Sequence, residues 1–259
     1  MNKNPIGIFD SGVGGLSIWK DINQLLPNES TIYIADSSNA PYGEKSKKKI
    51  TELSIKNTEL LLAQNCKLIV VACNTATTNS IEKLRETYAI PFIGIEPATK
   101  YAAINTKTGK IGILATKGTL ASELFLNTSE KYRGDIEIIE TIGTGLVAKI
   151  ESGNLDNAEP LLREYLQPMI DKNVDNIVLG CSHYPFLSSV IKRIIPPGVT
   201  IIDSGEAVAK QTENILKDSN ILNSTESPAE HLFYTNAKHD LLEMFLKKIR
   251  AANYAIQSL

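Results

Sequence analysis

The sequence predicts an α/β fold of two similar domains, each with a mainly parallel sheet flanked by helices. Short runs rich in Ile and Val alternate with longer segments of helical periodicity, as in parallel α/β proteins. The runs show no regular polar alternation, which is expected for strands that helices cover on both faces. A chain of 259 residues is long enough for two domains of ordinary size.

Eight apolar runs are expected to form these strands. Four precede the polar segment 101–109 and four follow it, which indicates two like-folded halves facing each other across a cleft. A ninth run, 231–235, is expected to return to the first domain. The first domain is therefore predicted at residues 1–97 plus 207–259 and the second at 98–206, with the active site in the cleft between them. The eight runs are Ile6–Phe9, Thr31–Ala35, Leu68–Ala72, Pro91–Ile95, Lys110–Leu114, Ile136–Ile139, Asn176–Leu179 and Val199–Ile202.

Three segments between and after these runs have the apolar spacing of amphipathic helices. The first lies around 81–88, the second spans 161–170, where Pro168 should kink the helix, and the third spans 241–249. We interpret their apolar stripes as core packing. The polar segment 219–230 is expected to be a surface loop.

Composition and charge exclude several classes of protein. A net charge of −2 gives no electrostatic case for binding nucleic acid or a membrane surface. The sequence contains no apolar stretch long enough for a membrane span, and its N-terminus does not resemble a signal peptide. Three widely spaced cysteines do not form a disulfide framework, and no tetrahedral zinc spacing occurs. We therefore expect a cytoplasmic protein without a bound metal.

Two cysteines lie where an open α/β sheet places its ligands. Cys73 and Cys181 each follow an apolar run directly, at the predicted carboxyl edge of a sheet and the start of a helix. A helix N-terminus lowers the pKa of a thiol, so both positions favour a reactive thiolate. Asn74 and Thr75 can offer hydrogen bonds to a carboxylate, and His183 can act as an acid/base partner of Cys181. The third cysteine, Cys66, has no such neighbours and is interpreted as structural.

The first glycine-rich turn, residues 10–17, allows two interpretations. Its glycines and Asp36, about twenty residues later, resemble a dinucleotide-binding fingerprint and therefore a nicotinamide enzyme. However, Ser17 occupies the third glycine position, and Asp10 would place a carboxylate beside the pyrophosphate. A turn that binds the carboxylate or ammonium group of an amino acid fits equally well, with Asp10 as an acceptor and Ser11 as donor or acceptor.

The second turn, residues 36–43, ends at the same edge of the predicted sheet. Taken alone it is an ordinary strand-to-helix loop, but its position makes Tyr42 and the backbone of Gly43 candidate ligand contacts. The lysines that follow, at 45 and 47–49, are most simply a solvated helix face, with a basic binding patch as the less favoured alternative.

Two thiols on opposite sides of one substrate could invert a stereocentre without a cofactor. A thiolate would remove a proton from one face of a carbon, and a thiol would return a different proton to the other face. A cysteine hydrolase that uses Cys181 and His183 is an alternative, but it leaves Cys73 and its polar neighbours unexplained.

Five motifs in the chain resemble those of the glutamate racemases, in the aspartate/glutamate racemase family, and occur in the family's order. The resemblance implies two α/β domains and a cofactor-independent isomerase that interconverts L- and D-glutamate and supplies D-glutamate for peptidoglycan. It implies glutamate as the small-molecule partner, and it allows a homodimer. The motifs are Asp10-Ser-Gly-Val-Gly-Gly15, Pro41-Tyr-Gly43, Cys73-Asn-Thr-Ala76, Glu96-Pro97 and Gly180-Cys-Ser-His-Tyr-Pro185.

The resemblance also implies roles for individual residues. Cys73 and Cys181 would be the catalytic acid/bases, with Asp10 assisting Cys73 and His183 assisting Cys181. Glu151 matches an acidic position that the family places near that histidine. The glutamate site would be lined by Asp10, Ser11, Tyr42, Gly43, Asn74, Thr75, Ser182 and His183.

Ser182 departs from the threonine that is usual in the family, which keeps the hydroxyl donor but loses a methyl group. Two further alternatives remain open. One is a racemase of the same family acting on aspartate, although the His-Tyr-Pro sequence at 183–185 favours glutamate. The other is a binding or regulatory protein that has lost turnover, although such a protein would not need paired thiols.

Overall fold

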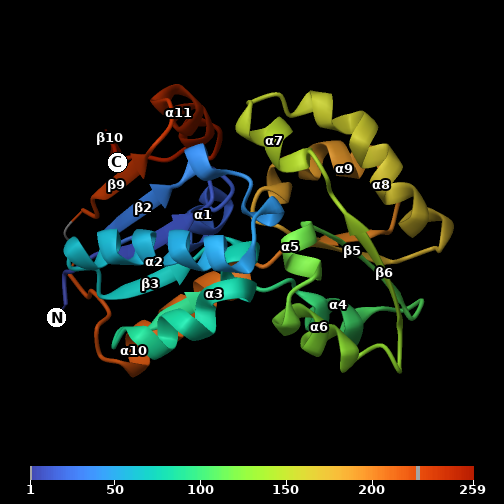
Figure 1. The fold of residues 1–259 in the computed structure, drawn as a ribbon, viewed down its shortest axis with the longest axis horizontal. Helices are drawn as coiled ribbons and strands as arrows, with labels where there is room; N and C mark the ends of the chain where they lie inside the picture. Colours follow the sequence, from blue (N-terminus) through green and yellow to red (C-terminus); the bar gives the residue numbers. More distant parts are fainter. Residues whose placement is uncertain (1, 226–227) are drawn as a thin grey trace.

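The structure is a computed structural model that describes residues 2–225 and 228–259. It contains two separate sheets, and each lies in its own lobe of the molecule (Figure 1). The six-stranded sheet has the order β10-β9-β2-β1-β3-β4, and the four-stranded sheet has the order β6-β5-β7-β8. Every strand pair in both sheets is parallel. The predicted fold class is therefore confirmed.

All nine strands expected from the apolar runs are present in the structure. The ninth, β9, pairs with β2 and so joins the sheet of the N-terminal segments, as expected. A further strand, β10, was not expected from the sequence. The strands are β1 Ile6–Asp10, β2 Thr31–Ala35, β3 Leu68–Val71, β4 Phe92–Gly94, β5 Lys110–Ala115, β6 Glu137–Ile142, β7 Asn176–Gly180, β8 Thr200–Ile202, β9 His231–Thr235 and β10 Tyr254–Ser258.

Helices pack against both sheets, and the three predicted amphipathic segments are helical. The chain remains helical on both sides of Pro168, inside α8. The helices are α1 Leu16–Leu25, α2 Lys47–Ala63, α3 Asn74–Thr87, α4 Thr99–Asn105, α5 Lys117–Leu120, α6 Glu123–Glu130, α7 Leu146–Glu151, α8 Glu159–Asp171, α9 Ser188–Ile194, α10 Gly205–Asp218 and α11 His239–Lys248. Four short 3₁₀ helices are η1 Ser37–Asn39, η2 Tyr42–Glu44, η3 Asp156–Ala158 and η4 Tyr184–Leu187.

The described part of the predicted loop 219–230 contains no helix or strand, and residues 226–227 lie outside the described residues. Within the described ranges, none of the helices has the combined length and apolar character of a membrane span. The domain boundaries at 97/98 and 206/207 stay a prediction. Helix α10, which starts near the second of these boundaries, packs against α1.

The carboxyl ends of the strands face the junction between the two lobes. Asp10 ends β1 opposite Ala35, and Cys73 lies two residues after β3 in the same sheet. Cys181 follows β7 in the other sheet. Because the strands of each sheet run in the same direction, these chain segments end at one edge, and the two edges bring their polar side chains together.

A buried ion pair lies at the amino ends of β2 and β3 in the first lobe. Lys67 Nζ lies 2.6 Å from Glu29 Oε2, and both side chains are almost completely buried. Lys67 Nζ also donates to the carbonyl of Asn2 at 2.9 Å, while Glu29 Oε1 accepts the amide of Asn223 at 2.7 Å. The pair therefore connects four chain segments that are distant in sequence.

Replacing Glu29 with glutamine is expected to destabilise the protein by about 3–5 kcal/mol, because it leaves the buried Lys67 ammonium without its counter-charge. Denaturant titration of the variant measures this loss. Glu243→Gln, at the exposed pair with Lys247, is the matched control and should destabilise the protein far less. Equal losses in the two variants would contradict the prediction.

Candidate active site

Cys73 lies at the start of α3, where its sulfur acts as the helix cap. The sulfur accepts the amide of Ala76 at 3.4 Å, and its S–H points to Ser11 Oγ at 3.7 Å. Burial raises the pKa of the Cys73 thiol well above its usual range, and the Asp10 carboxylate raises it further, against the opposing amide of Ala76. The expectation that the helix start favours a thiolate is therefore wrong for Cys73, because burial outweighs the helix.

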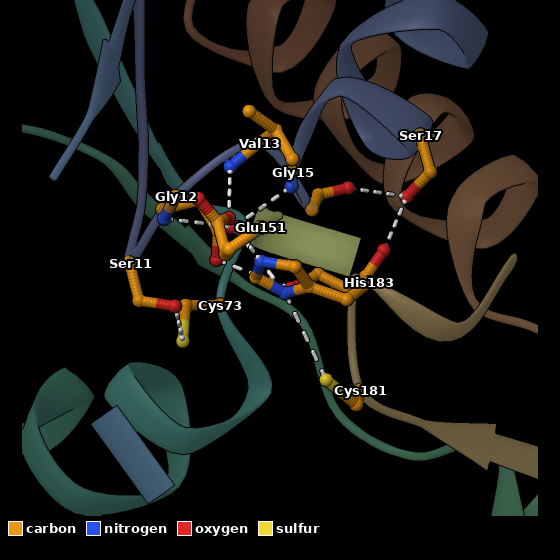
Figure 2. A network of polar contacts seen from close by, with 12 residues as sticks. Ser11, Gly12, Val13, Gly15, Ser17, Cys73, Glu151, Cys181 and His183 are labelled. Carbon is orange, nitrogen blue, oxygen red and sulfur yellow. Dashed lines mark hydrogen bonds and ion pairs between the residues drawn. The ribbon is translucent and has the colours of Figure 1, made fainter. Parts of the chain in front are cut away.

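Cys181 follows β7 directly, but a turn and the 3₁₀ helix η4 come after it rather than an α-helix. Its side chain is buried, and its sulfur lies 3.9 Å from Nδ1 of His183. The predicted pairing of this thiol with this imidazole is thus present in the structure. The two cysteines come from different sheets, and Figure 2 shows them on either side of the polar network that connects the lobes.

The glycine-rich turn wraps around its own carboxylate. The amides of Gly12 and Gly15 donate to Asp10 Oδ2 at 3.3 and 2.8 Å, and Ser182 Oγ donates to Oδ1 at 3.1 Å. A Cβ at position 15 would lie 2.8 Å from both Asp10 Cβ and Tyr33 Oη, so only glycine fits there. Because Asp10 already occupies these two amides, they are not free for a pyrophosphate, which is evidence against the dinucleotide interpretation.

His183 bridges this turn to the second lobe. Its Nε2 lies 2.7 Å from Glu151 Oε1, which also accepts the amide of Val13 at 2.7 Å (Figure 2). A Cβ at Gly14 would lie 2.1 Å from Nδ1 of His183, so the imidazole packs directly onto the turn. Burial by itself lowers the pKa of His183, but the hydrogen bonds with Cys181 and Glu151 and the charge of Asp10 raise it well above its usual value.

Ser182 connects Asp10 to the pair of Cys181 and His183. Ser182 Oγ lies 3.4 Å from His183 Nδ1 as well as contacting Asp10, and its carbonyl accepts a hydrogen bond from Ser17 Oγ at 2.9 Å. Burial raises the pKa of Asp10, and the charge of His183 and the amide of Gly15 oppose that rise. Asp10, Ser182 and His183 are all almost completely buried, so water hardly reaches them.

Asn74 offers buried, unpartnered hydrogen-bonding groups at the site. The residue is 1% exposed, yet its side-chain Nδ2 and Oδ1 have no hydrogen-bond partner within the described ranges. A buried amide without partners costs about 1–3 kcal/mol per group, so such a group indicates a ligand that satisfies it. Its neighbour Thr75 lies at the contact between the lobes, with Oγ1 2.8 Å from Thr116 Oγ1 and 3.3 Å from Thr119 Oγ1.

Tyr42 and Gly43 also lie at this contact between the lobes, but they differ in the groups that are free to bind a ligand. The Tyr42 hydroxyl donates to the Asp36 carboxylate and accepts from Asn57 Nδ2, so it is already occupied. A Cβ at Gly43 would lie 2.7 Å from Thr116 Cβ, so the backbone approaches the second lobe closely. Asp36 therefore supports the turn, and the backbone of residues 42–43 is the part available to a ligand.

Thr116 and Thr119 were not singled out from the sequence. Thr116 follows β5 directly, so the signal that identified the other site residues, a polar side chain at a strand end, was present here too. Cys66 is buried apart from the network, and burial raises the pKa of its thiol to about 12, in agreement with a structural role. No three His, Cys, Asp or Glu side chains within residues 2–225 and 228–259 are grouped to hold a metal ion.

The family model for Asp/Glu/Hydantoin racemase matches residues 6–212. The glutamate racemase of Herpetosiphon aurantiacus is 45% identical, covering 88% of this chain and 90% of that protein. The glutamate racemase of Pseudomonas entomophila is 41% identical and covers 100% of this chain and 99% of its own length.

The chain is also similar to solved structures of glutamate racemases. A glutamate racemase isoform of Bacillus anthracis superposes with a TM-score of 0.89 at 30% identity, over 100% of this chain and 98% of that chain. Escherichia coli glutamate racemase, solved with L-glutamate and the activator UDP-MurNAc-ala, superposes with a TM-score of 0.86 at 31% identity. The superposition covers 99% of this chain and 98% of that chain. The chain therefore belongs to the Asp/Glu/Hydantoin racemase family.

Proposed function

We propose that this protein is a glutamate racemase that interconverts L- and D-glutamate by a two-base thiol mechanism without a cofactor. The observation that carries the proposal is the pair of buried thiols, one from each sheet, around the network of Asp10, Ser182 and His183. Glutamate as the substrate is supported by relatives named glutamate racemases at 38–47% identity. It is also supported by similar structures solved with D-glutamate and L-glutamate.

In the proposed reaction one cysteine acts as a thiolate and the other as a thiol. The thiolate takes the α-proton from one face of glutamate, and the thiol gives its own proton to the opposite face of the resulting carbanion. Asp10 assists Cys73, and His183, held by Glu151, assists Cys181. After inversion the two sulfurs have exchanged protonation states, so the enzyme is ready for the opposite enantiomer. Burial of both thiols excludes water and keeps the proton transfers between protein and substrate.

The substrate's polar groups would be held by residues around these thiols. Asn74 would provide the unpartnered side-chain amide, and Thr75 and Ser11 would provide hydroxyls. Tyr42 and Gly43 would contribute their backbone rather than the tyrosine hydroxyl, which Asp36 occupies. Ser182 would donate the hydroxyl that the family usually takes from threonine, and Asp10 and His183 would complete the site.

The proposed product, D-glutamate, would be used for peptidoglycan synthesis. The chemistry requires reduced thiols, and all three cysteines are free in the structure, which supports our expectation of a cytoplasmic enzyme. A homodimer remains compatible with the proposal.

The first experiment is incubation of the purified protein with L-glutamate in deuterated water, without added cofactor. Loss of circular dichroism together with deuterium at the α-carbon, followed by NMR, is the expected result. Folded protein that neither inverts nor exchanges glutamate would overturn the proposal. The same assay with aspartate then tests the related racemase, and release of a hydrolysed product would indicate the cysteine hydrolase.

A further inference from the structure

Two cavities lie at the contact between the lobes, just outside the buried site. The larger has a volume of about 580 Å³ and the smaller about 210 Å³, and both are lined by Gly43, Glu44 and Lys117. Lys45 and Lys47 also line the larger one. We call these two cavities together the vestibule. Two of its lysines belong to the lysine-rich segment 45–49, which had no role in the proposed chemistry.

The close contact of Gly43 with Gly118, beside the hydrogen bond between Thr75 and Thr116, separates the vestibule from the site. A Cβ at Gly118 would lie 3.2 Å from Gly43 Cα and 3.0 Å from Thr75 Cγ2, so the two glycines close the space directly above Thr75. Asn79 Nδ2 donates to the carbonyl of Gly118 at 3.2 Å across the same contact. Because Thr75 is adjacent to the unpartnered Asn74, separation of Gly43 and Gly118 would open a short path from the vestibule to the site.

The charges of the vestibule favour an anion. Its three lysines outnumber its two glutamates, Glu44 and Glu123, although the whole chain has a net charge of −2. Lys47 is partly neutralised by Glu123, 3.9 Å away on α6. Lys45 and Lys117 form no ion pair within the described part of the chain. These two lysines are therefore the cations whose field is available to a ligand.

We propose that the vestibule captures the anionic substrate and passes it between Gly43 and Gly118, with Lys45 and Lys117 supplying the attraction. The inference rests on the proposed function, because free glutamate has a net negative charge at neutral pH. A cleft with an excess of charge of one sign attracts ligands of the opposite sign and raises their rate of association. The two lysines act before the chemical step and do not touch the reacting atoms, so they should affect kcat/KM much more than kcat.

The test compares kcat/KM of the wild type with that of the double variant Lys45→Gln, Lys117→Gln. At about 0.01 M salt, where the Debye length is about 30 Å, kcat/KM of the variant should be about fivefold lower than that of the wild type, mainly because KM is higher. At about 1 M salt, where that length is about 3 Å, the difference should disappear. The charge-preserving variant Lys45→Arg, Lys117→Arg should keep the wild-type value and salt dependence.

Lys48→Gln is the matched control, because Lys48 is exposed on the same segment but does not line the vestibule. At low salt it should lose clearly less kcat/KM than the double variant, and at high salt it should match the wild type. An equal loss for Lys48→Gln, a loss that persists at high salt, or no loss in the double variant would each overturn the inference. In the last case an active wild type would leave the proposed function intact, whereas a wild type inactive on glutamate would overturn both.

Discussion

Replacing Cys73 with alanine is expected to lower kcat/KM for glutamate racemisation by about a thousandfold or more, towards the upper end of the usual effect of an acid/base group. Cys181→Ala should have an effect of the same size. Both side chains are buried beside the connecting network, and inversion needs a proton donor or acceptor on each face of the substrate. Circular dichroism of L- and D-glutamate, assayed separately, measures the loss.

The symmetry of the reaction makes this prediction stricter. L- and D-glutamate have equal free energies in water, so the equilibrium constant is one, and kcat/KM for the two enantiomers must stay equal in every variant. In each alanine variant, kcat/KM should therefore decrease by the same factor for L- and D-glutamate, even though each thiol acts on a different face of the substrate. A cysteine hydrolase would instead lose activity with Cys181→Ala alone and retain it with Cys73→Ala.

Deuterium exchange distinguishes the two faces where racemisation cannot. A variant that keeps one thiol can still remove and return a proton on that side, so it should exchange the α-proton of one enantiomer without inverting it. Cys73→Ala and Cys181→Ala should show opposite preferences in NMR of the α-proton. Cys66→Ala is the control, because Cys66 is buried away from the network and should affect stability only. Exchange of the same enantiomer by both variants would contradict the two-base assignment.

The arrangement of the strands could be predicted from the sequence because apolar runs of this kind need cover on both faces. Once the sheets are parallel, side chains after the strands must meet at the carboxyl edges, and this rule identified Cys73 and Cys181. The strand β10, residues 254–258, was missed. It is an edge strand with mostly exposed or half-buried side chains, so it lacks the apolar run of the buried strands.

The electrostatics of the site could not be predicted from neighbours in sequence. The pKa of Cys73 is raised, not lowered, because burial and the charge of Asp10 depend on how the two lobes close around the thiol. In the same way Tyr42 was expected to contact ligand, and only the structure shows that its hydroxyl is occupied by Asp36. Local pattern and the family resemblance predict which residues belong to the site, whereas tertiary packing decides their protonation and which of their hydrogen-bonding groups are free.

His183 is expected to control the alkaline side of the pH profile of kcat/KM. Its raised pKa keeps the imidazolium present at neutral pH, where it can donate Nδ1–H to the Cys181 sulfur 3.9 Å away. Activity that depends on the protonated form is complete below this raised pKa and is lost as the pH rises through it. His183→Asn should remove this titration and lower kcat/KM by about 10²–10⁴-fold.

Glu151→Gln tests the same titration without removing the imidazole. The hydrogen bond and charge of Glu151 help to raise the pKa of His183, so the amide should lower that pKa and shift the alkaline loss of kcat/KM towards lower pH. The amino group of free glutamate titrates identically in every assay, so the shift between wild type and variant reports the enzyme. Lys48→Gln, which changes an exposed charge on α2, should leave the profile in place. An unchanged alkaline limb in Glu151→Gln would show that His183 does not carry this titration, because the variant removes the negative charge beside its Nε2.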